Sequence, residues 1–108
     1  MKAWEIWTAD VHGEHPVVLV SHQARIDAKP EVVVLQCRTM RPGSEREPRV
    51  NEVVLDQADG LDWKTPCRCD LLYSVAKGDL RQRRGVVTKE RRGIIARKIV
   101  QGLAIAGL

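Results

Sequence analysis

The sequence is poor in the residues that build large aromatic cores. Among its 108 residues are no phenylalanine, one tyrosine and three tryptophans, so a core has to rest on Val, Leu, Ile and Ala. No apolar run approaches the roughly 18 residues of a membrane-spanning helix, and the opening MKAWEIW has no long apolar stretch of a signal peptide. These absences predict a cytoplasmic protein without a membrane segment.

Cysteine is also scarce and does not form a metal-binding pattern. The three cysteines, Cys37, Cys67 and Cys69, are an odd number, which favours reduced, mostly buried thiols over a disulfide framework. A Cys-x-Cys pair with one distant cysteine lacks the paired Cys-x-x-Cys spacing of structural zinc sites. The sequence therefore predicts no metal site and no cofactor.

Length and charge indicate one globular domain, residues 1–108, in which basic residues are unevenly spread. Hydrophobic residues make up 44% and charged residues 30%, and the net charge is +4. Half of the 18 Lys and Arg residues follow Val75: Lys77, Arg81, Arg83, Arg84, Lys89, Arg91, Arg92, Arg97 and Lys98. This asymmetry fits a polyanionic partner, RNA, DNA or an acidic protein, and it equally fits a basic face that is only solvated.

Apolar alternation and β-branched runs predict several short strands followed by one helix. The strands are expected over residues 4–9, 16–21, 31–39, 50–55, 64–75 and 84–87. Residues 10–15 form a polar turn, 22–30 a loop or helical turn, and 40–49 a long loop. Thr88 is expected to cap a helix whose apolar stripe comprises Ile95, Ile99, Leu103 and Ala106. The pattern predicts a mostly β fold, a small antiparallel barrel with a long C-terminal helix.

The stretch KTPCRCDLLYSV, residues 64–75, carries the strongest chemical signal. On a strand, Arg68 and Asp70 point to the same face, while Cys67 and Cys69 point to the other face, into a core. An arginine beside a carboxylate suits phosphate chemistry, because one neutralises phosphate oxygens and the other orients or accepts a proton. The same two residues also fit an ordinary surface salt bridge.

Taken in order, these segments resemble the MazF/PemK/Kid family of toxin ribonucleases from bacterial toxin–antitoxin pairs. The resemblance rests on WEIWTAD, HPVVLVS, VVVLQCRT, NEVVLDQADGLDWKTPCRCDLLYSV and GVVTKERRGIIARKIVQGLAIAGL, which together cover about nine-tenths of the chain. It implies the SH3-like barrel of MazF and CcdB toxins with a long C-terminal helix, usually as a homodimer. It also implies the toxin of a type II system, an mRNA interferase that cleaves single-stranded RNA without metal by attack of the ribose 2′-OH.

The same resemblance assigns roles to individual residues. Arg68 and Asp70 match the family's R-C-D segment as catalytic residues, and His12 corresponds to a loop histidine of the Kid-like members. Glu5 matches the acidic residue of the first strand; Arg38, Thr39 and Arg41 are the expected RNA contacts at the end of the third. The implied partners are single-stranded RNA and a cognate acidic antitoxin.

One departure from the family concerns the second strand. The family carries an arginine before its proline, and this chain has His15. A histidine can serve as an acid or base near neutral pH, but it is not a permanent cation. His15 is therefore expected either to take a catalytic role or to mark an impaired member that only binds RNA, or a protein target as CcdB-like gyrase inhibitors do.

Overall fold

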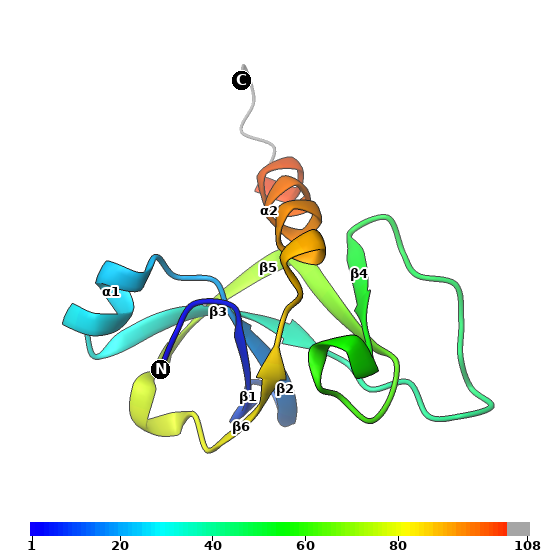
Figure 1. Ribbon diagram of the computed structural model, residues 1–108, viewed down its shortest axis with the longest axis horizontal. Helices are drawn as coiled ribbons and strands as arrows, with labels where there is room; N and C mark the ends of the chain where they lie inside the picture. Colours follow the sequence, from blue (N-terminus) through cyan, green and yellow to red (C-terminus); the bar gives the residue numbers. More distant parts are fainter. Residues whose placement is uncertain (104–108) are drawn as a thin grey trace.

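A computed structural model, which describes residues 1–103, shows one coiled antiparallel sheet and a C-terminal helix (Figure 1). The elements are β1 (Glu5–Asp10), β2 (Glu14–Leu19), α1 (Gln23–Ala28), β3 (Glu31–Cys37), β4 (Glu52–Leu55), the 3-10 turn η1 (Gln57–Asp59), β5 (Thr65–Ala76), the 3-10 turn η2 (Lys77–Asp79), β6 (Gln82–Val86) and α2 (Lys89–Leu103). The strand order is β4-β5-β3-β2-β1-β6. The predicted mostly β fold with a C-terminal helix is confirmed, the sheet forming a half-barrel.

Strand β5 organises the sheet because it pairs with both of its neighbours and bends between them. Its first residues pair with β4, where Arg68 lies opposite Glu52, and its last residues pair with β3. Cys67 is already opposite Cys37 of β3, but the β3 pairing resumes only at Leu72. Residues 68–71 therefore form the bend, and Arg68 and Asp70 lie within it.

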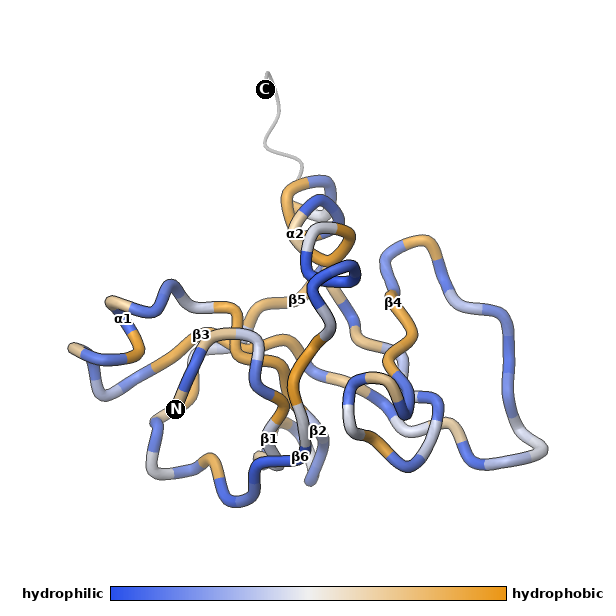
Figure 2. The backbone as a smooth tube through the Cα atoms, in the orientation of Figure 1, coloured by the Kyte–Doolittle hydropathy of each residue, from blue (hydrophilic) through white to orange (hydrophobic). Residues whose placement is uncertain are grey.

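Two apolar clusters lie on the opposite faces of the sheet. The cluster under α2 contains Ile95, the three cysteines and residues of every strand except β6. The cluster under α1 contains Ile26 and residues of β1, β2 and β3. Apolar segments accordingly concentrate on the strands, whereas the loop between β3 and β4 is mostly hydrophilic (Figure 2). Each helix therefore shields a different face of the sheet from water.

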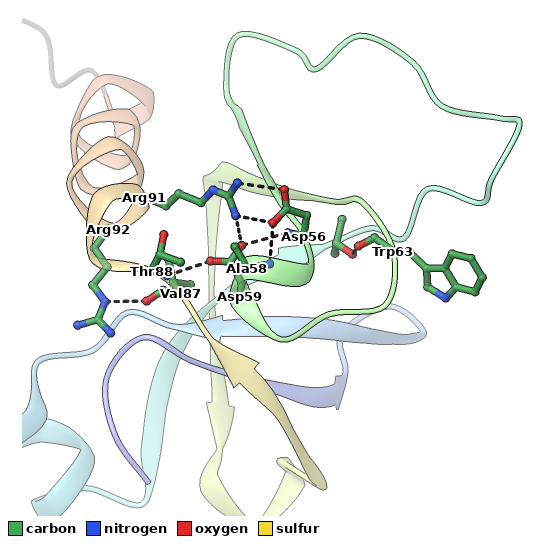
Figure 3. A network of polar contacts seen from close by, with 9 residues as sticks. Asp56, Ala58, Asp59, Trp63, Val87, Thr88, Arg91 and Arg92 are labelled. Atoms are coloured by element: carbon green, nitrogen blue, oxygen red, sulfur yellow. Dashed lines mark hydrogen bonds and ion pairs between the residues drawn. The ribbon is translucent and has the colours of Figure 1, made fainter.

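Helix α2 is fixed to η1 by an ion-pair network (Figure 3). Arg91 contacts the carboxylates of Asp56 and Asp59, and Asp59 Oδ1 accepts a 2.9 Å hydrogen bond from the Thr88 backbone N–H. The helix begins just after Thr88, as predicted. On the other side of η1, a Cβ at Gly85 of β6 would lie 2.0 Å from the Asp59 carbonyl oxygen. The turn η1 thus joins α2 to the edge strand β6, and its backbone packs tightly against that strand.

Several details differ from the sequence prediction. The turn between the first two strands covers only residues 11–13, so His15 and Pro16 lie inside β2, because the antiparallel pairing with β1 extends to Asp10 and Glu14. The helix stripe is used only in part: Ile95 is buried and Ile99 packs beside it, but Leu103 is 54% exposed. Ala106 lies outside the described residues. No helix of residues 1–103 is both long and apolar enough to span a bilayer.

Candidate nucleic-acid interface on strand β5

Arg68 and Asp70 lie side by side, as the strand spacing predicted. Arg68 Nε is 4.0 Å from Asp70 Oδ1, and the two side chains are 24% and 32% exposed. Cys67 and Cys69 point into the α2-side cluster instead. Within residues 1–103 the Arg68 guanidinium donates no hydrogen bond, and Asp70 Oδ1 is shielded from water without a donor. The pair is therefore loosely held and keeps free hydrogen-bonding capacity, unlike an optimised salt bridge.

Helix α2 narrows the surroundings of Asp70 without pairing with it. A Cβ at Gly102 would lie 3.1 Å from the Asp70 Cα and 3.4 Å from its Cβ. The end of the helix therefore packs directly on this part of the β5 bend. A side chain at this position would be crowded against the strand, so Gly102 helps to set how closely the helix approaches the Asp70 carboxylate.

Glu52 and Arg46 are neighbours of this pair that no sequence pattern indicated. Glu52 faces Arg68 across the β4–β5 ladder, and its carboxylate accepts two 2.8 Å hydrogen bonds from Arg46 and one of 2.9 Å from the Arg49 backbone N–H. The bidentate Arg46 contact lowers the pKa of Glu52 to about 2, despite burial, which acts in the opposite direction. A carboxylate in this state adds a fixed negative charge beside Arg68.

The segment after β3 runs alongside the start of β5. The Arg38 N–H donates to the Pro66 carbonyl at 2.9 Å, and the Met40 N–H donates to the Lys64 carbonyl at the same distance. Cys37 points inward, so alternation turns Arg38 to the outer face, the face of Arg68. Arg38, Thr39 and Arg41 are all exposed. Their role as RNA contacts stays a prediction, but Arg38 is well placed for it.

The β1–β2 turn folds back over the sheet and brings His12 to β5. The Gln36 side chain of β3 donates a 2.7 Å hydrogen bond to the Val11 carbonyl, and Val11 is buried. His12 has a positive φ of 54°, and its ring meets the Tyr73 ring edge-on at 5.8 Å between centroids. Tyr73 is three residues beyond Asp70 on the same strand, so the turn reaches β5, and a catalytic role for His12 stays a prediction.

His15 and Glu5 occupy different surroundings. His15 is half-buried on β2, and its ring stands beside Gly13 of the turn. Glu5 lies on β1, three strands from β5 in the sheet order, and is bound by Arg83 at 2.7 Å and by the Lys2 N–H. Burial raises the Glu5 pKa, but these hydrogen bonds outweigh it, so the pKa is lowered overall. Glu5 thus has a structural partner, and its contact with RNA stays a prediction.

Three of the nine basic residues after Val75 pair with carboxylates of the described residues. Arg81 pairs with Glu14 at 3.0 Å, Arg83 with Glu5, and Arg91 with Asp56 and Asp59. The charge asymmetry in the sequence is therefore a weaker sign of a polyanionic partner than the count implies. The described residues also contain no group of three His, Cys, Asp or Glu side chains that could hold a metal.

Neither a protein-family model nor a curated protein sequence matches this chain. Solved structures do. The Mycobacterium tuberculosis toxin MazF-mt6 is 20% identical with a TM-score of 0.79, over 94% of this chain and 97% of that one. An endoribonuclease in complex with its cognate antitoxin, from a mycobacterial species, is 20% identical with a TM-score of 0.83, over 100% and 99%.

A structure with lower sequence identity has the same fold. A MazE–MazF complex from Deinococcus radiodurans is 13% identical with a TM-score of 0.76, over 98% of this chain and 97% of that one. Each match spans nearly the whole of both chains, so the likeness concerns the entire architecture and not a shared sheet alone. The chain therefore has the fold of the MazF toxins.

Proposed function

We propose that this protein is the toxin of a type II toxin–antitoxin system and cleaves single-stranded RNA in the cytoplasm without a metal. The observation that carries the proposal is the loosely held Arg68–Asp70 pair on the outer face of β5, within a MazF-type fold. An ion pair that served only stability would be expected to saturate its hydrogen bonds, whereas no residue among 1–103 accepts a hydrogen bond from the Arg68 side chain.

The chemistry follows from the groups around the pair. The ribose 2′-oxygen attacks the adjacent phosphorus and the P–O5′ bond breaks, which leaves a 2′,3′-cyclic phosphate and a 5′-hydroxyl. Arg68 stabilises the charge on the non-bridging oxygens, and Asp70 orients the 2′-hydroxyl or accepts its proton. His12 or His15 supplies the proton to the departing 5′-oxygen. Arg38, Thr39 and Arg41 bind flanking phosphates, and Glu5 contacts the RNA from β1.

The test is cleavage of single-stranded RNA by the purified chain in EDTA, with mapping of the ends. We expect 2′,3′-cyclic phosphate termini and a loss of at least 100-fold in the rate for Arg68→Ala, in line with the removal of one charge-stabilising donor. Arg25→Ala, which removes an exposed arginine of α1, is the matched control and should cut normally. Intact RNA at high concentrations of the wild-type protein would refute the enzyme.

His15 decides between an active and an impaired site. If His15 supplies the proton, replacing it with arginine lowers the rate. If the chain is instead a binding module whose site has decayed, His15→Arg raises cleavage strongly. Cleavage rates of the wild type and His15→Arg on one RNA substrate therefore distinguish an active site from an impaired one.

Two partners belong to the proposal. The first is a short acidic antitoxin, and expression of the chain alone should arrest growth while co-expression of an acidic neighbouring reading frame relieves it. The second is another copy of this chain. Leu71 and Leu72 at the β5 bend, and Val100 on α2, are exposed apolar side chains that a dimer would cover. Light scattering coupled to gel filtration measures whether the protein is a homodimer.

A further inference from the structure

A cleft beneath the loop between β3 and β4 adjoins the groups discussed so far and shares Arg46 with the Glu52 ion pair. It consists of two hollows of about 500 and 490 Å³ that share Met40, Glu45 and Lys64 as walls. The first extends to Pro42, Asp62 and Trp63, and the second to Arg46 and Val54. A single exposed ion pair, Glu45–Lys64 at 3.1 Å, crosses between them. The two hollows together form one cleft.

The cleft opens on the face of the sheet that carries Arg68. Val54 lies opposite Pro66 in the β4–β5 ladder, and Glu52 lies opposite Arg68. Alternation places Val54 and Glu52 on one face, together with Lys64, Pro66 and Arg68. At about 3.3 Å per residue, Lys64 is roughly 13 Å along the strand from Arg68. A strand of RNA bound at Arg68 can therefore continue into the cleft.

The lining of the cleft favours a flat group with N–H donors over a phosphate. Trp63 is 47% exposed, and its indole points away from the ion-pair network of Arg91 (Figure 3). A face of the indole ring is therefore available for stacking. Among the described residues, the two cations of the lining are both engaged, Lys64 by Glu45 and Arg46 by Glu52. The carboxylate of Asp62 has no hydrogen-bond partner in the same part of the chain. Such a site repels phosphate and accepts hydrogen bonds from an amino group.

We propose that this cleft holds a nucleobase of the substrate RNA, on a nucleotide other than the one with the scissile phosphate, and so sets sequence preference. The base stacks on Trp63, and Asp62 accepts a hydrogen bond from an exocyclic amino group, which cytosine, adenine and guanine carry and uracil lacks. The phosphates stay outside the acidic lining, where Arg38 and Arg41 are exposed. The inference rests on the proposed ribonuclease activity and adds to it the origin of its specificity.

The first experiment measures specificity position by position. A library of single-stranded RNA with randomised flanks is cleaved by the wild-type chain, Trp63→Ala and Trp63→Phe, with Val50→Ala as an exposed apolar control that lines neither hollow. We expect Trp63→Ala to lose between about 5-fold and 150-fold in kcat/KM for the preferred base at one position, and Trp63→Phe to recover most of it. Equal loss at every position, or no loss, overturns the inference while the ribonuclease proposal stands.

The second experiment does not depend on cleavage. The indole N–H signals of Arg68→Ala are recorded by NMR, with that of Trp63 identified by its absence in the Arg68→Ala, Trp63→Ala double variant. The probes are oligoribonucleotides of five cytidines, five adenosines or five uridines, and a nona-arginine peptide. We expect cytidine or adenosine to shift the Trp63 signal most, even if the wild type proves inactive. A response to nona-arginine alone assigns the cleft to a protein partner, and that result or no response overturns the inference.

Discussion

Glu52 is expected to make the stability of this protein sensitive to acid. Its side chain is only 2% exposed and its carboxylate is held by Arg46 and by the Arg49 backbone N–H. These contacts lower its pKa to about 2, from about 4.3 in an unfolded chain. Because the ionised form is favoured in the folded state, Glu52 contributes stability above about pH 5 and loses it as the pH falls through 4 towards 2.

The size of the contribution follows from the pKa difference. A difference of about two units corresponds to roughly 3 kcal/mol at pH 7, since each unit is worth about 1.4 kcal/mol. Glu52→Gln should therefore lower the free energy of unfolding at pH 7 by about 2–3 kcal/mol, or the melting temperature by roughly 10 °C or more. Below pH 2 the two proteins should have nearly equal stability.

Urea unfolding followed by circular dichroism between pH 2 and 7 provides the measurement. Glu47→Gln, which changes an exposed carboxylate on the loop between β3 and β4, is the matched control and should leave the curve unchanged. Some acid sensitivity will remain in Glu52→Gln, because Arg91 also lowers the pKa of Asp56. If wild type and Glu52→Gln lose stability in parallel over this range, the Arg46–Glu52 contact does not have the strength argued here.

Two further predictions concern packing. Gly85→Ala should prevent folding or lower the melting temperature strongly, because its Cβ would overlap the Asp59 carbonyl oxygen 2.0 Å away, whereas Gly78→Ala has open space and should be neutral in the same thermal melt. The three buried thiols should react with Ellman's reagent only after denaturation, since the neighbouring Cys37 thiol and burial raise the pKa of Cys67. Rapid labelling of the native protein would contradict the packing around β5.

The sequence was sufficient to predict most elements of the fold. Alternation and β-branched runs located the strands, and Thr88 marked the start of α2. Both signals depend on residues a few positions apart, which share a face or a turn whatever the rest of the chain does. The same logic predicted that Cys67 and Cys69 are buried while Arg68 and Asp70 face outward.

The surroundings of the candidate site could not be predicted from local sequence patterns. Arg46 lies in a loop without periodicity, and nothing in the sequence links it to Glu52 or links Glu52 to Arg68. The extension of β2 to Glu14, which places His15 in a strand, depends on how far β1 continues to pair. The cleft that Trp63 lines exists only because the β3–β4 loop, through Pro42 and Glu45, meets the segment that precedes β5.

Charge shows the division between sequence and structure most clearly. The sequence by itself determined the number of basic residues after Val75 and the strands and helix that carry them. Only the tertiary structure decided which of them are neutralised, because Arg83 finds Glu5 across 78 positions of sequence and Arg91 finds Asp56 across 35. Local conformation follows from neighbours along the chain, whereas an ion pair requires two distant segments to meet, and the packing of the whole sheet fixes which segments do.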